Sequence, residues 1–264
     1  MRDNLQMIVH RFPAGQDEIE IVPIADVHLG AEEHRAKDWK QFCASVLERP
    51  NVYLILAGDL CNNAIKSGIS NVYAEKIPPS TQKRMMAEQL KPLADEGRIL
   101  ACTGGNHEWR SKKEVDDDMM LDVCSKLNIE DIYRRDACFL KIVMGERCKD
   151  HNYHTFVIGM THGAGGGIYT GASVNRSERF AQTIDGLDIL VAGHTHKIHT
   201  TKPMKLRVDV NHDLVVPRPY YVVNVGSWMD YGGYAMRKML LPSSPGLQII
   251  KLGRIGRTIE VVTR

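Results

Sequence analysis

Ile189-Leu190-Val191-Ala192-Gly193-His194-Thr195-His196 is an apolar run that stops at a glycine and then presents two histidines. Four consecutive apolar residues followed by a glycine are typical of a buried strand that ends at a turn. In an extended backbone, positions i and i+2 point to the same side, so His194 and His196 are expected to face one pocket. Because neutral imidazole is a common metal ligand, this stretch predicts a metal site at the end of a buried strand.

Several apolar runs upstream also end in side chains that can bind a metal. These are Asp26 with His28 after residues 19–25, Asp59 after 52–57, Asn106 with His107 after 98–102, and His162 after 155–160. In open α/β sheets, ligands bind beyond the carboxyl ends of the strands. We therefore expect these five strand ends to meet around one site.

The donor types indicate which metals such a site would hold. Carboxylate and amide oxygens mixed with imidazole suit Mn, Fe or Zn, and the lack of cysteine ligands disfavours a structural zinc site. The candidate ligands are too many for one ion: Asp26, His28, Asp59, Asn106, His162, His194 and His196. A shared carboxylate, for which Asp59 is the candidate, would bridge two ions ~3.5–4 Å apart. The prediction is two divalent metal ions, with manganese first and Fe, Zn or Ni as alternatives.

Other histidines compete for these roles. His151 and His154 are alternatives to His162, but they lie in the polar stretch 149–154, which is typical of a solvated turn. His162 is preferred because a strand end precedes it and a glycine follows it. We expect His199 on a strand that leaves the site. The remaining histidines are expected at the surface, namely His10, His34 and His212.

The amino-acid composition indicates which class of protein this is. With 43% hydrophobic and 25% charged residues among 264, the chain resembles an ordinary globular protein. A net charge of +2 gives no overall field that would favour nucleic acid or a membrane surface. Six cysteines without a CxxC pair indicate reduced thiols in a cytoplasmic protein. No apolar run approaches the ~20 residues that span a bilayer, and Met1-Arg2-Asp3-Asn4 does not begin a signal peptide. We therefore expect no membrane partner.

The patterning predicts an α/β protein. Strands are expected at 5–10, 19–25, 52–57, 98–102, 137–144, 155–160, 187–193, 198–208, 220–225, 247–252 and 258–263. Helices are expected at 35–48, 81–95 (with Ser80 as N-cap), 112–127 and 174–184. The first half of the chain alternates strands and helices, which favours parallel crossover units. The last third of the chain is rich in strands, which favours a second, mixed sheet. We expect one domain over residues 1–264, with two packed mixed β-sheets flanked by helices.

The series of motifs resembles the calcineurin-like metallophosphoesterase superfamily. The motifs are Asp26-x-His28, Gly58-Asp59, Gly105-Asn106-His107-Glu108, the lone His162, and Gly193-His194-x-His196. The resemblance implies an α+β type sandwich in which Asp26, His28 and His196 hold one metal and Asn106, His162 and His194 hold the other. Asp59 and a hydroxide would bridge the two ions, and the hydroxide would attack a phosphoester. His107 would protonate the leaving group or bind a phosphate oxygen, and Arg110 is a further phosphate contact.

Three functions remain open for such a site. A phosphodiesterase acting on nucleotides or nucleic acid is favoured, because Asp26-Val27-His28-Leu29-Gly30 with Gly58-Asp59-Leu60 resembles the diesterase branch. A phosphomonoesterase of protein-phosphatase type is the alternative, although Asn62 and Asn63 stand where such phosphatases carry aspartate and arginine. A non-catalytic module that retains its metals is the third. The low net charge is evidence against a long nucleic-acid duplex as substrate.

Overall fold

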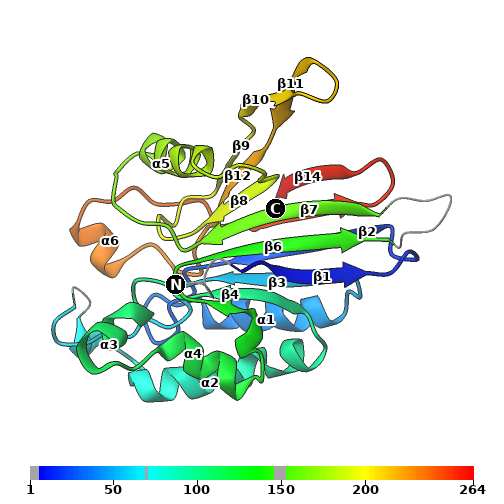
Figure 1. Cartoon of the computed structure of the whole chain (residues 1–264). Coiled ribbons are helices and arrows are strands. Elements are labelled where there is room, and N and C mark those ends of the chain that lie inside the picture. The colour runs from blue at the N-terminus through cyan, green and yellow to red at the C-terminus, as the bar shows by residue number, and fades with distance from the viewer. Residues whose placement is uncertain (1–5, 69–70, 146–152) are drawn as a thin grey trace.

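A computed structural model describes residues 6–68, 71–145 and 153–264 of the protein. Two six-stranded sheets lie against each other (Figure 1), with strand orders β1-β6-β7-β8-β12-β9 and β14-β13-β2-β3-β4-β5. Each sheet contains both parallel and antiparallel pairs. The predicted α/β sandwich of two packed mixed sheets is therefore confirmed.

Apart from one projecting hairpin, the strands in the last third of the chain join the two large sheets and form no mixed sheet of their own. The first sheet consists of β1 (Ile8–Phe12), β6 (Ala137–Met144), β7 (His154–Thr161), β8 (Ile189–Ala192), β12 (Tyr221–Asn224) and β9 (His199–Thr201). The second consists of β14 (Thr258–Thr263), β13 (Gln248–Gly253), β2 (Glu18–Ile24), β3 (Val52–Ala57), β4 (Ile99–Thr103) and β5 (Tyr133–Arg134). Late strands thus extend both sheets: β12 pairs with β8, and β13 pairs with β2. This pairing satisfies backbone groups that an open edge would leave exposed.

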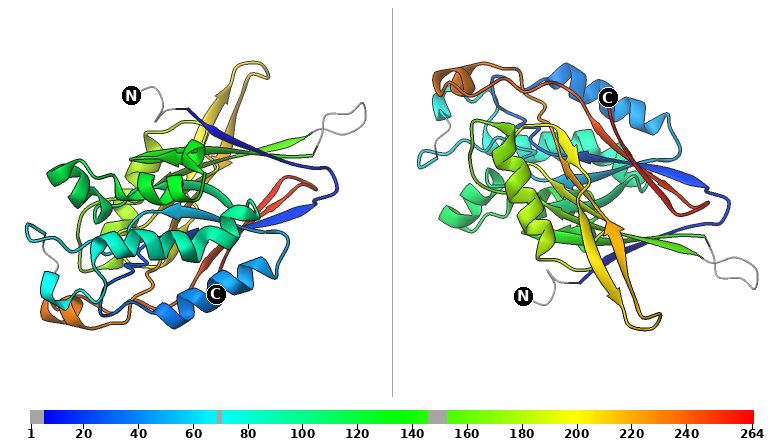
Figure 2. Two further views of the ribbon diagram at one scale, coloured as in Figure 1. Left: turned by 90° about the horizontal axis from the view of Figure 1, so that it is seen from below. Right: turned by 90° about the horizontal axis from the view of Figure 1, so that it is seen from above.

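Helices flank the two sheets. They are α1 (Ala36–Leu47), α2 (Pro79–Asp95), α3 (Glu108–Val115), α4 (Met119–Lys126), α5 (Thr170–Gln182) and the short α6 (Gly233–Arg237), with 3₁₀ turns at Val72–Ala74 and Glu130–Ile132. In Figures 1 and 2, α1 to α4 lie on the side of the second sheet, while α5 lies on the other side of the molecule and contacts β8 and β12.

Two helix predictions differ from the structure. The single helix expected over 112–127 is two helices, because Asp116 adopts a left-handed backbone (φ 59°) and the Asp118 carboxylate caps α4 through the Leu121 N–H. The prediction that Ser80 is an N-cap is wrong, because α2 begins at Pro79 and its N-cap is Pro78. Proline suits the first helical position because its φ is already helical and its missing N–H has no partner there.

A two-stranded hairpin projects from the sandwich. The strand expected at 198–208 is divided into β9 and β10 (Met204–Asp209), and β10 pairs with β11 (Leu214–Pro219), a strand that the sequence did not predict. Figure 1 shows this pair extending beyond both sheets. At its base, the Lys205 ammonium donates to three carbonyls at the end of α5, which fixes the hairpin to the body.

Apolar side chains fill the core, and both faces of the second sheet are buried, because neighbouring positions along a strand point to opposite faces. Fully buried examples are Ile21, Ile24, Leu54 and Leu56 from the second sheet, and Phe156 from the first. The five cysteines described are buried and unpaired, as expected, while Cys148 and His151 lie outside the described residues. Within the described ranges, no helix is both long and apolar enough to cross a membrane.

Candidate metal centre

The strand ends identified in the sequence meet at one edge of the sandwich. Asp26 and His28 follow β2, Asp59 follows β3, Asn106 follows β4, His162 follows β7, and His194 and His196 follow β8. Parallel strands β2, β3 and β4 place their carboxyl ends at the same edge of the second sheet, and β7 and β8 do so in the first. The structure therefore gathers all seven candidate ligands from both sheets.

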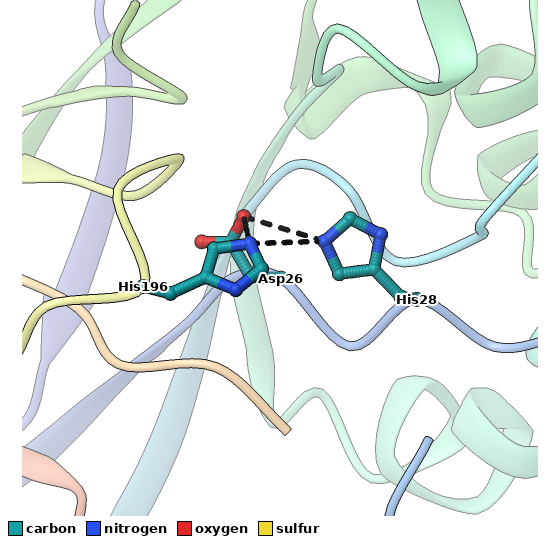
Figure 3. A group of neighbouring side chains, drawn as sticks. All are labelled: Asp26, His28 and His196. Carbon is teal, nitrogen blue, oxygen red and sulfur yellow. Dashed lines mark hydrogen bonds and ion pairs between the residues drawn. The ribbon is translucent and has the colours of Figure 1, made fainter. Parts of the chain in front are cut away.

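One group of donors consists of Asp26, His28 and His196 (Figure 3). The Nε2 atoms of His28 and His196 lie 3.2 Å apart. Oδ1 of Asp26 lies 3.2 Å from Nε2 of His196 and 3.7 Å from Nε2 of His28. These three atoms converge on a space that a single cation would fill, and Oδ1 of Asp26 is buried without a hydrogen-bond partner.

The second group consists of Asn106, His162 and His194. Oδ1 of Asn106 lies 3.0 Å from Nε2 of His162 and 2.7 Å from Nδ1 of His194. The other ring nitrogen of His162 donates to the Ala57 carbonyl at 2.8 Å, which leaves Nε2 as the coordinating atom. Asn106 thus supplies an oxygen between two imidazoles.

Asp59 is the side chain common to both groups. Its Oδ2 lies 3.1 Å from Nε2 of His162, 4.0 Å from Nε2 of His28 and 3.8 Å from Nε2 of His107. The carboxylate is 2% exposed, so these histidines, not water, are its surroundings. Its position fits the shared ligand of a two-ion site.

The backbone at these strand ends is left-handed. Positive φ angles occur at Asp26 (54°), His28 (49°), Asp59 (52°), His194 (69°) and His196 (56°). The prediction that an extended backbone aligns His194 with His196 is therefore wrong, and the two rings belong to different donor groups. Such conformations are uncommon for residues other than glycine and concentrate at functional sites.

Hydrogen bonds between segments hold these conformations. The Asp26 N–H donates to the Gly58 carbonyl at 3.1 Å, the His28 N–H to the Asp59 carbonyl at 3.0 Å, and the His194 N–H to Oδ2 of Asp26 at 2.8 Å. Gly105 packs so closely on the Asp59 loop that an added Cβ would lie 2.1 Å from the Asp59 carboxylate. The β3 and β4 loops therefore fit together only with glycine at that position.

The site contains opposite charges that shift one another's pKa values. Burial alone would raise the pKa of Asp26 and of Asp59, but the surrounding imidazoles, led by His196 and His162 respectively, lower both. Burial opposes protonation of His162, yet the Asp59 carboxylate raises its pKa to about 10. Two buried carboxylates among imidazoles form a strongly cation-binding environment, which fits divalent metal ions.

His107 and Arg110 lie beside the donors and contact each other. The Nδ1–H of His107 donates to the Asn62 carbonyl at 2.6 Å, and Nη2 of Arg110 donates to Nε2 of His107 at 2.8 Å. Burial lowers the pKa of His107 to about 3, against the opposing charge of Asp59. The ring is therefore neutral, with the Asn62 backbone as its orienting partner.

Glu108 has a role that the sequence did not reveal. Oε2 accepts the backbone N–H groups of Asp59 and Gly105, and Oε1 accepts that of Cys61, each at 2.9 Å. Burial, reinforced by the charge of Asp59, raises the pKa of Glu108 to about 7. The available signal in the sequence was the position of Glu108 directly after Asn106 and His107. A buried carboxylate at that position links the loops that follow β3 and β4.

The expectations for the other histidines are partly wrong. His34 is half-buried, and its Nδ1–H donates at 2.8 Å to the carbonyl of Val27, between two candidate ligands. His10 is also half-buried and contacts the Leu100 carbonyl at 2.7 Å. Both rings find backbone acceptors that the sequence could not show. His212 is exposed as expected, and His154 begins β7, at the opposite end of that strand from His162.

The comparisons with known proteins identify a family for the chain. The sequence profile described as calcineurin-like phosphoesterase matches residues 19–198, a range that contains all seven candidate ligands, His107 and Arg110. No curated protein matches the chain.

Two solved structures are similar to this chain. A conserved uncharacterized protein, a predicted phosphoesterase from Streptococcus pneumoniae TIGR4, has 11% identity and a TM-score of 0.37 over 94% of this chain and 98% of that one. The Haemophilus influenzae NAD nucleotidase has 10% identity and a TM-score of 0.42 over 94% of this chain and 50% of that one. With the profile matching more than half of its length, the chain belongs to the calcineurin-like phosphoesterase family.

Proposed function

We propose that the protein is a dinuclear metal-dependent phosphodiesterase. The observation that carries this proposal is the position of Asp59, whose Oδ2 contacts His162 of one donor group and approaches His28 of the other. Asp26, His28 and His196 would hold one ion, and Asn106, His162 and His194 the second. When bound, the two ions would stabilise charge on the phosphoester oxygens and provide a nucleophilic hydroxide near neutral pH.

The donor set supports manganese as the first choice of metal. It combines imidazole, carboxylate and amide oxygen and contains no thiolate among the described residues around it. Such mixed sets also suit Fe, Zn or Ni, so the test is selective reconstitution with each ion in turn.

His107 and Arg110 would act on the phosphoryl group. The guanidinium of Arg110 donates to the neutral His107 ring and also to the Asn62 carbonyl at 3.2 Å, so the ring and guanidinium form one unit beside Asp59. We propose that Arg110 contacts a phosphate oxygen. His107 would protonate the leaving group once the negative charge of the substrate raises its pKa from about 3.

Two cavities beside the metal centre support a diester substrate. One, of about 330 Å³, is lined by Asn106 and His162, and the other, of about 390 Å³, is lined by Gly193 and Thr195. The first lies toward the β4 and β5 ends, and the second lies between α5 and the β8 and β12 ends. A phosphodiester carries two organic substituents, and each cavity would take one.

Asn62 and Asn63 weigh against the protein-phosphatase alternative. Nδ2 of Asn62 donates to Glu75 at 3.0 Å, and Nδ2 of Asn63 donates to Ser111 and to the His107 carbonyl at 2.8 Å. Both amides therefore support the loop, and neither supplies the carboxylate or guanidinium that such phosphatases carry at these positions.

The test is hydrolysis of bis(4-nitrophenyl) phosphate and of 4-nitrophenyl phosphate by the manganese-loaded protein, with Asp59→Asn as the blank. The proposal expects two metal ions per chain and a clear preference for the diester. A preference for the monoester would favour the phosphatase alternative. Two bound ions without turnover of either compound would favour a non-catalytic binding module.

A further inference from the structure

Trp109 is an exposed tryptophan at the edge of the metal centre. Of the three tryptophans, Trp39 is fully buried and Trp228 is 7% exposed, whereas Trp109 is 42% exposed. It lies in the first turn of α3 and lines the 330 Å³ cavity together with the candidate ligands Asn106 and His162. An indole ring in this position loses the hydrophobic stabilisation that burial would give, so it is a candidate contact for a ligand.

The wall of the same cavity carries an ion pair. Oδ2 of Asp118 and Nε of Arg135 lie 3.5 Å apart, and both of these atoms are buried, so they pair with each other and not with a ligand. The other carboxylate oxygen of Asp118 accepts the Tyr133 hydroxyl at 3.0 Å, which fixes the carboxylate in place. The ion pair holds the Arg135 guanidinium in the wall, and because the Arg135 side chain is 40% exposed, its remaining N–H groups can donate to a ligand.

Arg135 also connects this polar wall to the aromatic ring. Its guanidinium lies 5.3 Å from the centre of the Trp109 ring. The cavity thus combines a flat aromatic surface with a guanidinium over it that can donate hydrogen bonds. A ligand that uses both has a planar ring and an edge with acceptor atoms.

A nucleobase has this combination. Its faces stack on aromatic side chains and guanidinium groups, and its edges carry donors and acceptors. An alkyl substituent offers no acceptor to the Arg135 guanidinium, and a bare sugar offers no planar ring for Trp109 to stack on. A cavity of about 330 Å³ lies within the range that binds small ligands.

We infer that this cavity is a nucleobase subsite, with Trp109 as its stacking platform and the Arg135 guanidinium at the base edge. One substituent of the phosphodiester is then a nucleoside. The assignment of substrate class rests on the proposed function, whereas binding of a nucleotide at Trp109 does not require turnover.

The binding test uses the fluorescence of the full chain in the presence of EDTA, which prevents turnover and quenching by manganese. Acrylamide quenches exposed tryptophans, so its effect reports on Trp109 while Trp39 and Trp228 provide the buried background. Adenosine 5′-monophosphate is expected to protect Trp109 from acrylamide in a saturable manner, and ribose 5-phosphate to give no protection. Equal quenching with and without adenosine 5′-monophosphate would overturn the subsite.

The kinetic test compares thymidine 5′-(4-nitrophenyl) phosphate with methyl 4-nitrophenyl phosphate, which lacks a base. Trp109→Ala is expected to raise KM for the thymidine diester roughly 5- to 150-fold, the factor that corresponds to loss of one stacked base. Its effect on the methyl diester should be small, and Trp109→Phe should restore most of the affinity. Equal losses on both diesters would overturn the inference. Absence of turnover by wild type would instead contradict the proposed function, and the fluorescence test would still decide the subsite.

Discussion

The Nε2 atoms of His28 and His196 lie 3.2 Å apart, although 168 positions separate the two residues in the chain. Two imidazole lone pairs at that distance repel unless a proton or a cation lies between them. The Asp26 carboxylate, 3.2 Å from the same His196 nitrogen, adds the negative charge that favours a cation there. This contact between β2 and β8 loops is the core of the first donor group.

His196→Gln is expected to remove one of the two metal ions. An amide is a weaker ligand than imidazole, and loss of even an outer partner of a metal ligand costs 10–100-fold in affinity. Metal analysis after dialysis should give about one ion per chain, and adding His28→Gln should remove no further ion. Loss of both ions in His196→Gln would contradict the assignment of His194 to the other donor group.

Asp59→Asn is expected to weaken both ions, because this carboxylate is the ligand that the two groups share. The affinity for metal and the rate of diester hydrolysis should each fall by more than roughly 100-fold. Asp17→Asn is the matched control, since Asp17 is an exposed partner of Arg254 outside the site. Two tightly bound ions in Asp59→Asn would rule out the bridging role.

His107→Ala is expected to keep both ions and to lose activity. The ring lies 3.8 Å from Asp59, but its nitrogens are engaged by Asn62 and Arg110. With a poor leaving group such as an alkoxide, kcat should fall ~10²–10⁴-fold, and with 4-nitrophenolate the loss should be smaller. A metal-free His107→Ala protein would show that His107 is a ligand instead.

Glu108→Gln is expected to destabilise the fold as well as the site. The substitution replaces one of the two carboxylate oxygens by an amide donor, so at least one of the three backbone N–H groups loses its acceptor, at a cost of about 1–3 kcal/mol. Urea unfolding in EDTA measures this cost without a contribution from metal. The control Glu88→Gln changes an exposed residue of α2 and should stay within about 0.5 kcal/mol of wild type. Equal stabilities for the two variants would contradict the structural role of Glu108.

His34 should make the folded state sensitive to acid. Burial lowers its pKa below the ordinary 6.5, so the unfolded chain binds a proton more readily and stability falls as the pH drops below about 6.5. His34→Gln keeps a donor for the Val27 carbonyl and removes this titration. In EDTA, its Tm should drop less between about pH 7.5 and 5.5 than that of wild type or of His212→Gln, which changes an exposed histidine. An equal drop in all three proteins would contradict the prediction.

The regular elements were largely predictable because their patterning is local. Apolar runs such as 52–57 and 137–144 coincide with β3 and β6, since a buried strand must be apolar over its own length. The break between α3 and α4 was not predictable from apolar spacing, because it depends on the left-handed backbone at Asp116. Strand β11 was missed because Pro217 and Pro219 interrupt its short apolar run, and proline is confined to strands outside the core of a sheet.

The sequence by itself determined which residues stand at the strand ends, and hence the chemical nature and family of the site. The resemblance also implied that His196 and His194 belong to different donor groups. Only the tertiary structure decided the contacts between segments, with Nε2 of His196 3.2 Å from Nε2 of His28 and Nδ1 of His194 2.7 Å from Oδ1 of Asn106. It also revealed Glu108, His34 and Trp109 as parts of the same edge. The reason is physical: residue type and apolar patterning are local, whereas left-handed backbones and buried hydrogen bonds arise from contacts between segments that lie far apart in the chain.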